Sequence, residues 1–314
     1  MAAGFYYIIF NPAAGAGTAV DIFKKIQARL DAQHIAYEIK VSRYSGHTIQ
    51  LAKQIGGFNH HANAVMLVIG GDGTLNQAIT GLHQTPHAEM PVAYIPAGSG
   101  NDFARGVGIS QDPLKALDQV LAAQHPTVID IGHYTEKTRG ESGYFVNNVG
   151  IGFDAAAVAA TNRSRFKTVL NRLHLGSLAY MVGVVGVFFS RKPFPVAIYV
   201  DGKRTYIQQA FLVTTTNHPY FGGGVRILPG ADPRDGKLDL IVVEHLNTPY
   251  FLFLCLQLLL GRHTKYKRVH VFESPRIELE TPSLEFGQMD GEELGSRPYE
   301  LSFHVEKQNF WFSV

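Results

Sequence analysis

The fold of the N-terminal half is decided by one stretch of sequence, Ala64-Val65-Met66-Leu67-Val68-Ile69-Gly70-Gly71-Asp72-Gly73-Thr74. Its first six residues are apolar, which is typical of a strand buried on both faces of a parallel sheet. The glycines that follow leave space around one aspartate, and Thr74 is expected to cap a helix that begins at Leu75. Amides at such a strand-to-helix turn bind anions, so we predict a nucleotide phosphate site here. An ordinary tight turn is the alternative.

The flanking sequence alternates short apolar runs with segments that have the three-to-four residue periodicity of helices. Strands are expected at 5–10, 37–41, 64–69 and 92–95, and helices at 18–30, 47–55, 75–82 and 113–123. Apolar strands separated by helices indicate a parallel sheet that is covered on both faces. We therefore predict a doubly wound α/β domain over residues 1–128.

After residue 128, strand-like runs follow one another with few helices between them. They are expected at 144–149, 194–200, 204–214, 238–243, 268–272 and 276–279. Asp201-Gly202 separates two of these runs and matches the pair that type I′ hairpin turns favour, because both central residues take positive φ. Residues 129–303 are therefore predicted to form a mainly antiparallel second domain.

Composition argues against several classes of protein. With 28 lysines and arginines against 26 aspartates and glutamates, the chain lacks the overall field of a nucleic-acid-binding protein. The single cysteine, Cys255, cannot form an internal disulfide, which fits a reducing cytoplasm. No signal peptide is recognisable, and the longest apolar runs, 178–189 and 250–260, are shorter than the ~18 residues that span a bilayer. We expect a cytoplasmic protein.

Two more glycine-rich turns follow strands of the first domain. One is Asn11-Pro12-Ala13-Ala14-Gly15, and the other is the polar segment Pro96-Ala97-Gly98-Ser99-Gly100-Asn101-Asp102-Phe103-Ala104-Arg105. Ligands of open parallel sheets bind beyond the carboxyl ends of the strands, so all three turns should face one crevice.

Other nucleotide-binding signatures fit less well. No Gly-x-x-x-x-Gly-Lys-Ser/Thr loop is present, which excludes a Walker A site. The run from Gly150 to Ala155 matches the alanine form of the dinucleotide fingerprint, but no acidic residue between Ala155 and Val200 is available to hold a ribose. We interpret this match as accidental.

With these turns, the chain resembles the soluble bacterial diacylglycerol kinase family, whose catalytic domain is shared with sphingosine and ceramide kinases. The resemblance extends over essentially the whole chain and rests on five ordered motifs, Asn-Pro-x-x-Gly (11–15), Gly-Gly-Asp-Gly-Thr (70–74), Gly-Ser-Gly-Asn-Asp-Phe-Ala-Arg (98–105), Asp-Gly-Lys-Leu (235–238) and Asp-Gly-Glu (290–292). It implies that ATP lies over the N-terminal domain, that a C-terminal β-sandwich forms the other wall, and that a strand over 304–314 returns to the first domain.

The same resemblance implies roles for individual residues. Asp290 would be the general base near the acceptor hydroxyl, Glu292 would assist it, and Asp72 would manage the phosphates and the nucleotide magnesium. The nucleotide-binding set would be Asn11, Pro12, Gly15, Ser45, Gly70, Gly71, Asp72, Gly73, Thr74, Gly98, Ser99, Asn101, Asp102 and Arg105. Outside the family, Asp290-Gly291-Glu292 also reads as a simple hairpin turn.

A second, structural magnesium is implied near Asp235, with Asp232 and Lys237 beside it, since carboxylate and carbonyl oxygens are the ligands that this ion prefers. The chain also departs from the family in two places. Ala14 stands where relatives often have serine, and the basic residue that many relatives carry shortly afterwards is absent. One hydroxyl contact and one ion-pair partner of Asp102 are therefore in question.

We expect an ATP-dependent lipid kinase that converts diacylglycerol to phosphatidic acid. Residues 161–192 carry six basic side chains and no acidic one among apolar residues, which predicts peripheral contact with the inner face of the membrane. Exposed strand edges in the second domain favour a homodimer. The alternatives are a kinase of a soluble acceptor such as NAD, a kinase of a sphingoid or phosphatidylglycerol-like lipid, and a catalytically silent regulator that binds lipid or nucleotide.

Overall fold

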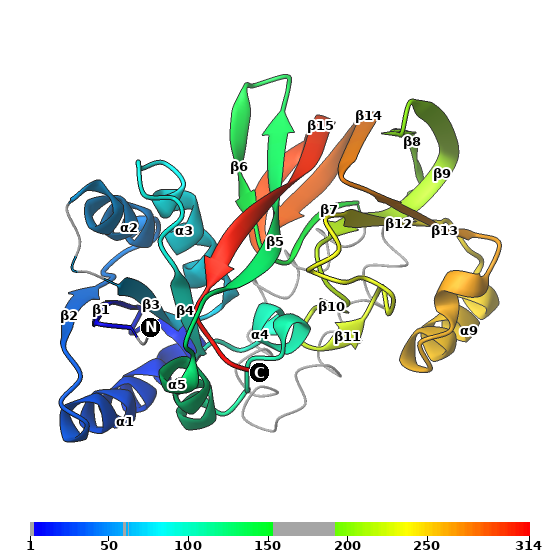
Figure 1. The fold of residues 1–314 in the computed structure, drawn as a ribbon. Helices are drawn as coiled ribbons and strands as arrows, with labels where there is room; N and C mark the ends of the chain where they lie inside the picture. The colour runs from blue at the N-terminus through cyan, green and yellow to red at the C-terminus, as the bar shows by residue number, and fades with distance from the viewer. Residues whose placement is uncertain (1–2, 59–60, 62, 153–191) are drawn as a thin grey trace. The chain divides into compact units, whose positions relative to one another are not determined.

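The computed structural model describes residues 3–58, 61, 63–152 and 192–314 (Figure 1). The basic segment predicted at 161–192 and the apolar run at 178–189 therefore lie outside the described residues, apart from the exposed Lys192. The chain divides into two compact units, one formed by residues 1–129 with 307–314 and the other by residues 130–306.

The first unit is built on a parallel sheet. Its strands are β1 (Phe5–Phe10), β2 (Tyr37–Val41), β3 (Ala64–Gly70) and β4 (Val92–Pro96), in the order β2-β1-β3-β4. Every residue of β3 and β4 is buried, which explains why these runs are continuously apolar.

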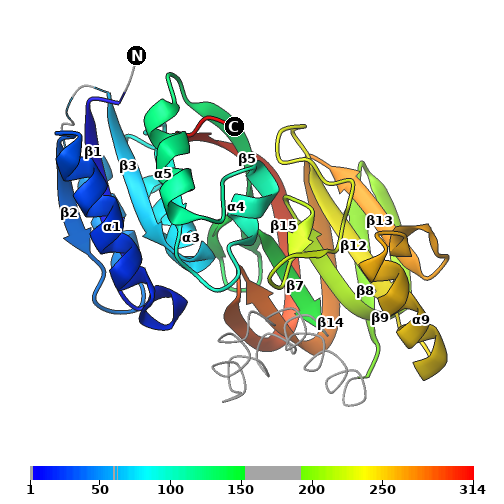
Figure 2. The same cartoon turned by 90° about the horizontal axis from the view of Figure 1, so that it is seen from below.

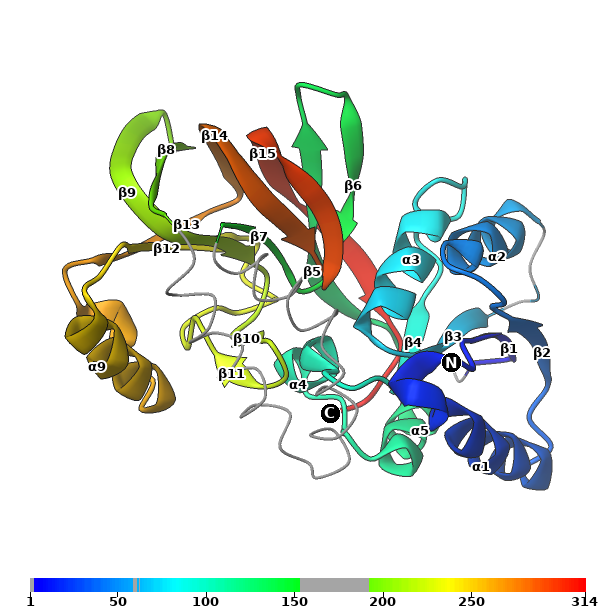
Figure 3. The same ribbon diagram turned by 180° about the vertical axis from the view of Figure 1, so that it is seen from behind.

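Helices cover both faces of this sheet. They are α1 (Ala19–Ala32), α2 (His47–Gly57), α3 (Asp72–Leu82), α4 (Asp102–Val107) and α5 (Pro113–Ala122), with the 3-10 turn η1 (Ala14–Gly17) before α1. Helices α2 and α3 lie on one face, and α1 and α5 lie on the other (Figures 1 and 3). The doubly wound α/β prediction is confirmed, with α4 as an additional short helix.

The segment after Glu306 completes this unit. Strand β15 (Glu292–Phe310) ends with Phe310 paired in parallel to Val92 of β4. The next residue, Trp311, donates its backbone N–H to the Val92 carbonyl (2.9 Å) and its indole N–H to the Val120 carbonyl (3.1 Å). The strand conformation stops at Phe310, so the last four residues are not part of a strand.

The second unit is antiparallel. Its strands are β5 (Thr127–Glu136, which leads into it), β6 (Glu141–Phe145), β7 (Asn148–Gly152), β8 (Phe194–Val200), β9 (Lys203–Thr216), β12 (Leu238–Glu244), β13 (Val269–Ser274), β14 (Arg276–Met289) and β15 up to Glu306, with a small hairpin of β10 (Tyr220–Phe221) and β11 (Val225–Arg226). The long strands β9 and β14 each pair with both β7 and β8. Their pairing closes a ring of four strands around an apolar core.

Helix α9 (Thr248–Leu259) packs beside β12 and β13, as Figure 2 shows, and is followed by the 3-10 turn η2 (His263–Lys265). The Asp201-Gly202 hairpin prediction is confirmed, because both residues take positive φ between β8 and β9. One strand prediction is wrong. Residues 144–149 do not form a single strand, because β6 ends at Phe145 and β7 begins at Asn148. The two intervening residues, Val146 and Asn147, instead donate their backbone N–H groups to the side chain of Asp290.

Candidate active site

The first two glycine-rich turns leave neighbouring strands at the point where the strand order reverses. From β1 the chain moves to β2 on one side, whereas β3 pairs with the other side of β1. Open α/β sheets bind ligands beyond the carboxyl ends of the strands at such a switch point. The turns that follow β1 and β3 therefore open at the expected position.

A side-chain contact joins these two turns. The Asn11 side-chain amide donates to the Thr74 hydroxyl (2.9 Å), and its oxygen accepts the Ala13 N–H (3.1 Å). The prediction that Thr74 caps a helix from Leu75 is wrong, because α3 already begins at Asp72 and its N-cap is Gly71. The Thr74 hydroxyl instead receives the hydrogen bond from Asn11.

Asp72 joins the second turn to the third. Its carboxylate accepts the N–H groups of Asp102 (3.1 Å) and Phe103 (3.3 Å), which are the first amides of α4. The backbones also meet closely, since a Cβ atom added to Gly98 would lie 2.5 Å from the Gly71 Cα. Only glycine fits there, and the carboxylate of Asp72 fixes the start of α4 as well as lining the turn.

The third turn is held by its own side chains. Asn101 takes a left-handed conformation (φ 53°), accepts the Gly98 N–H (2.9 Å) and donates to the Gly98 carbonyl (3.0 Å). Arg105 donates to the Asp102 carboxylate (2.7 Å) and to the Gly100 carbonyl (3.3 Å). Arg105 thus supplies an ion-pair partner for Asp102, although the basic residue common after Ala14 in relatives is absent.

Tyr94 lies beneath these turns and was not anticipated from the sequence. Burial, and after it the charges of Asp72 and Asp102, hold the pKa of Tyr94 well above its usual range. The protonated hydroxyl donates to the Gly70 carbonyl (3.3 Å) and lies 3.4 Å from the Asn101 side-chain oxygen. It therefore links the second and third turns from the interior.

The other predicted nucleotide-binding residues are placed as follows. Gly15 (φ 58°) also contacts the third turn, because a Cβ atom there would lie 2.5 Å from the Ala97 carbonyl oxygen. Pro12 lies in the first turn, Gly73 in the first turn of α3, and Ser99 is exposed in the third turn. Ser45 is exposed in the turn before α2, and among the described residues no hydrogen bond connects it to the three turns. The structure thus brings together all the predicted residues of this set except Ser45.

Asp290 forms the hairpin turn between β14 and β15 together with Gly291. Both residues take positive φ (47° and 87°), so the hairpin reading of this motif is also correct. The carboxylate of Asp290 additionally accepts three backbone N–H groups, from Val146 (2.8 Å), Asn147 (2.9 Å) and Asn148 (2.9 Å). The first two of these amides belong to the connection between β6 and β7 and the third to the first residue of β7, which explains why the predicted strand is broken there.

Buried polar side chains hold this connection. The Nε2 atom of His218, which is completely buried, lies 2.7 Å from the Asn147 side-chain oxygen. Gln288 donates to the Asn148 side chain and accepts the Gly291 N–H (3.0 Å). The supporting roles of His218, Gln288, Asn147 and Asn148 were not predicted from the sequence. The only signal in the sequence was the pair Asn147-Asn148 inside an otherwise apolar run. Glu292 is exposed at the start of β15.

The loop predicted to hold a structural magnesium is ordered by its own amides. Asp232 accepts the Arg234 N–H (3.1 Å), Asp235 accepts the Lys237 N–H (3.0 Å), and the buried Asp130 accepts the Gly236 N–H (2.7 Å). In the part of the chain that the structure describes, no three His, Cys, Asp or Glu side chains converge as a metal-binding group. The predicted ligand set relies partly on carbonyls, so it stays a prediction.

The electrostatics of this loop suit a cation. Burial, and after it the charges of Glu273 and Asp235, raise the pKa of Asp239 to about 7. The charges of Glu273 and Asp235 thus both act on Asp239, and Lys237, whose ammonium group pairs with Glu273, offsets them only in part. Oxygen ligands with excess negative charge are the set that Mg²⁺ binds.

Comparison with known proteins decides the family. Residues 6–134 match the diacylglycerol kinase catalytic domain, and residues 147–307 match the YegS C-terminal NAD kinase beta sandwich-like domain. A diacylglycerol kinase of Bacillus subtilis (strain 168) is 32% identical over 306 residues, which cover 91% of this chain and 91% of the relative. The chain belongs to the diacylglycerol kinase family.

A further relative and a solved structure are also similar to this chain. A diacylglycerol kinase of Mycobacterium tuberculosis (strain ATCC 25618 / H37Rv) is 25% identical over 303 residues, with 93% of this chain and 90% of the relative covered. A solved diacylglycerol kinase from Bacillus anthracis str. Sterne has the same fold, with a TM-score of 0.69 at 20% identity over 99% of this chain and 97% of that one. As a member of the diacylglycerol kinase family the chain is a lipid kinase, and the family implies that it uses ATP.

Proposed function

We propose that this lipid kinase transfers the γ-phosphoryl group of ATP to the free hydroxyl of diacylglycerol, giving phosphatidic acid and ADP. The observation that carries the proposal is the Asp290 carboxylate, which three backbone amides hold in one position. A two-residue hairpin does not need these contacts. A fixed carboxylate of this kind can orient an acceptor hydroxyl and receive its proton.

The proposed step needs only modest help from a base. The hydroxyl oxygen of the lipid bonds to the γ-phosphorus, the bond from that phosphorus to ADP breaks, and the hydroxyl proton passes to Asp290. Phosphoryl transfer has a loose transition state, so the hydroxyl loses its proton late and a carboxylate suffices as base. Glu292 is proposed to assist on the same hairpin.

The three glycine-rich turns are proposed to bind the phosphates through their amides, with Asp72 directed toward the nucleotide magnesium. When bound, Mg²⁺ would neutralise charge on the phosphates. A second Mg²⁺ is proposed beside the carboxylates of Asp232 and Asp235 and the backbone carbonyl of Lys237, where it would offset the nearby carboxylate charges. We further propose that the enzyme acts in the cytoplasm at the inner face of the membrane.

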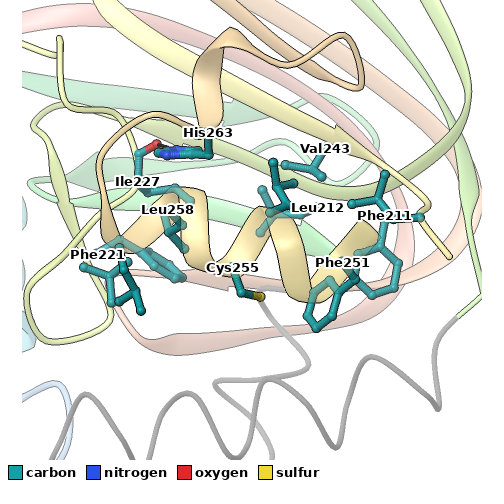
Figure 4. Close-up of a pocket in the computed structure, with 13 residues that line it drawn as sticks. Phe211, Leu212, Phe221, Ile227, Val243, Phe251, Cys255, Leu258 and His263 are labelled. Atoms are coloured by element: carbon teal, nitrogen blue, oxygen red, sulfur yellow. Dashed lines mark hydrogen bonds between the residues drawn. The ribbon is translucent and has the colours of Figure 1, made fainter. Parts of the chain in front are cut away.

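An apolar cavity in the second unit supports a lipid acceptor. Its volume is about 100 Å³, and it lies between α9 and the strands β9 and β12 (Figure 4). Its lining is almost entirely aliphatic and aromatic, and includes Phe211, Leu212, Val243, Phe251, Leu254 and Leu258. Such a cavity suits part of an acyl chain, whereas a nucleoside acceptor would meet few polar groups among the described lining residues, His263 being the main one.

The test is phosphate transfer from radiolabelled ATP to diacylglycerol in detergent micelles, with sphingosine, phosphatidylglycerol and NAD as competing acceptors. We expect labelled phosphatidic acid as the main product. Transfer to NAD in preference to every lipid would overturn the proposal, and transfer to another lipid would replace diacylglycerol as the acceptor.

The role of Asp290 is tested in the same assay by Asp290→Asn. We expect a loss of roughly 100-fold or more in kcat with ATP affinity unchanged, the size typical of removing a general base. The matched control is Asp201→Asn, because Asp201 occupies the same kind of Asp-Gly hairpin turn (φ 50°) in the same unit. Equal losses of kcat in the two variants would show that the effect comes from disturbing a hairpin turn and not from removing a general base.

A further inference from the structure

Helix α9 is apolar on two opposite faces. Its inner face, which includes Phe251 and Leu254, is buried against the second unit. Its outer face carries Leu252, Phe253 and Leu256, which are 54%, 39% and 55% exposed. A helix on a protein surface normally presents polar residues to water, so this outer face calls for a partner.

The outer apolar surface continues past the end of the helix. Leu259 and Leu260 are 62% and 56% exposed. Phe253 also stacks against Tyr250 (ring centroids 5.9 Å apart) and meets Tyr266 edge-on (5.2 Å). Leucines bordered by tyrosine rings are typical of the boundary between lipid headgroups and acyl chains.

Basic residues follow this surface directly. Arg262, Lys265, Lys267 and Arg268 are all exposed, and residues 245–272 contain no aspartate or glutamate. Arg268 contacts Glu244 at 3.7 Å, whereas the other three cations form no ion pair with any residue in the described ranges. A patch of positive charge beside an apolar face complements an anionic lipid surface.

Helix α9 cannot cross a bilayer. Within residues 3–58, 61, 63–152 and 192–314, no helix is both long and apolar enough to span a membrane, and α9 has only 12 residues. An apolar helix of this length, followed by cations, is suited to lie in the plane of the interface.

We propose that α9 and the loop over residues 260–268 form a docking surface for anionic membranes. The outer leucines enter the headgroup boundary, and the cations contact lipid phosphates. The inference rests on the proposed function in one respect, since a membrane lipid acceptor gives the docking its purpose. A second copy of this chain is a poorer partner, because a symmetric contact would bring the same cations of both copies together.

The test is sedimentation of the full chain with phosphatidylcholine vesicles, prepared with and without added phosphatidylglycerol, in the absence of ATP and diacylglycerol. We expect binding only to the anionic vesicles, and a loss of binding at high salt. The apolar contribution is tested with Leu252→Gln/Leu256→Gln, because neither residue lines the cavity beneath α9. We expect this variant to bind roughly tenfold more weakly or worse.

The charge contribution is tested with Lys265→Gln/Lys267→Gln, for which we expect a loss of roughly fivefold per charge. Matched controls are Leu284→Gln, at a leucine that is 72% exposed elsewhere in the second unit, and Lys53→Gln/Lys115→Gln, at two exposed lysines of the first. Circular dichroism confirms that every variant is folded.

The outcomes separate this proposal from the catalytic one. Diacylglycerol phosphorylation in micelles by a protein that does not bind anionic vesicles would overturn the docking surface alone. Vesicle binding without any lipid kinase activity would leave docking intact and reject the proposed reaction. Equal losses of vesicle binding in the test and control variants would overturn the docking proposal. It would also be overturned if Leu252→Gln/Leu256→Gln converted a dimer to a monomer without changing vesicle binding.

Discussion

Asp201 and Asp290 have the same backbone conformation but different surroundings. Each precedes a glycine in a two-residue hairpin turn, and each takes a left-handed conformation, which aspartate tolerates better than most residues. The carboxylate of Asp201 accepts a single hydrogen bond among those identified, from the Ser274 hydroxyl at the end of β13 (2.8 Å). The carboxylate of Asp290 accepts amides that lie more than 140 positions earlier in the sequence.

Gly98 provides a test of the contact between the second and third turns. We expect Gly98→Ala to lower the free energy of unfolding by about 1–3 kcal/mol, because the new Cβ atom would collide with the Gly71 backbone and the turns would have to separate. ATP binding should weaken as well, since the amides of both turns move. Urea unfolding and calorimetric titration with ATP measure the two effects.

The control for this change is Gly57→Ala. Gly57 is the last residue of α2, and a Cβ atom there would have no neighbour within 4 Å. We expect this variant to be as stable as the original or slightly more stable, with unchanged ATP affinity. If the two alanine variants behave alike, the close approach of the turns has no energetic role.

At the scale of residues, the sequence predicted which residues lie in the three turns better than it predicted their contacts. The glycines, Asn11, Asp72, Asn101 and Asp102 were assigned correctly to three turns that meet. The partners of Thr74 and Asp72 were not predictable, because each contact joins residues of different turns. The positions of Asp290 and His218 likewise depend on neighbours that are distant in the sequence.

At the scale of elements, the local sequence pattern gave a wrong prediction where a side chain distant in the sequence determines the backbone conformation. Residues 144–149 are mostly aromatic and apolar, and their pattern predicts one strand. In the structure, Val146 and Asn147 leave strand pairing to donate to the carboxylate of Asp290. Elements without such an intrusion, including β1, β2 and α5, agree with their predicted ranges to within a residue.

The packing of η2 under α9 makes stability depend on pH through His263. This residue is 2% exposed, its Nε2 atom contacts the Ile227 carbonyl (2.7 Å), and its Nδ1 atom has no hydrogen-bond partner among the described residues. Burial lowers the pKa of His263 below its ordinary value of 6.5. The imidazole of His263 therefore binds a proton more readily in the unfolded chain than in the folded one. Acidification below pH 6.5 should consequently lower the free energy of unfolding.

The measurement is urea unfolding at neutral and mildly acidic pH for the original protein and for His263→Gln. We expect the original protein to lose more stability on acidification than the variant, whose amide can still donate to the Ile227 carbonyl. His125→Gln, at an exposed histidine of the first unit, is the control. An identical loss in the original protein and His263→Gln would contradict the assignment.

At the scale of the whole molecule, Trp311 is important for a unit most of whose residues lie far earlier in the sequence. It is 5% exposed and hydrogen-bonded to both β4 and α5. Trp311→Ala should therefore lower the free energy of unfolding by about 3 kcal/mol, as expected for truncating a buried aromatic residue. Unfolding of the first unit, followed with and without ATP, measures this loss, whereas Val314→Ala, at an 85% exposed position, should change little.

The division of the chain was partly visible in its sequence. The change from alternating helices and strands to consecutive strands near residue 128 is local and could be read directly. The return of a late segment to the first domain was expected only from the resemblance, and its pairing with β4 was not predicted, because nothing in residues 307–314 identifies the partner strand. Their apolar character shows that they pack, and the structure shows where.

This arrangement has a consequence for biosynthesis. The first unit consists of residues 1–129 and 307–314, so about 180 residues of the other unit are translated between its two parts. A nascent chain that has emerged only as far as α5 still lacks the strand beside β4 and the indole beside Val120. The first unit is therefore completed only after the residues between its two parts have been translated, and until then the exposed edge of β4 is open to chaperones and to mispairing.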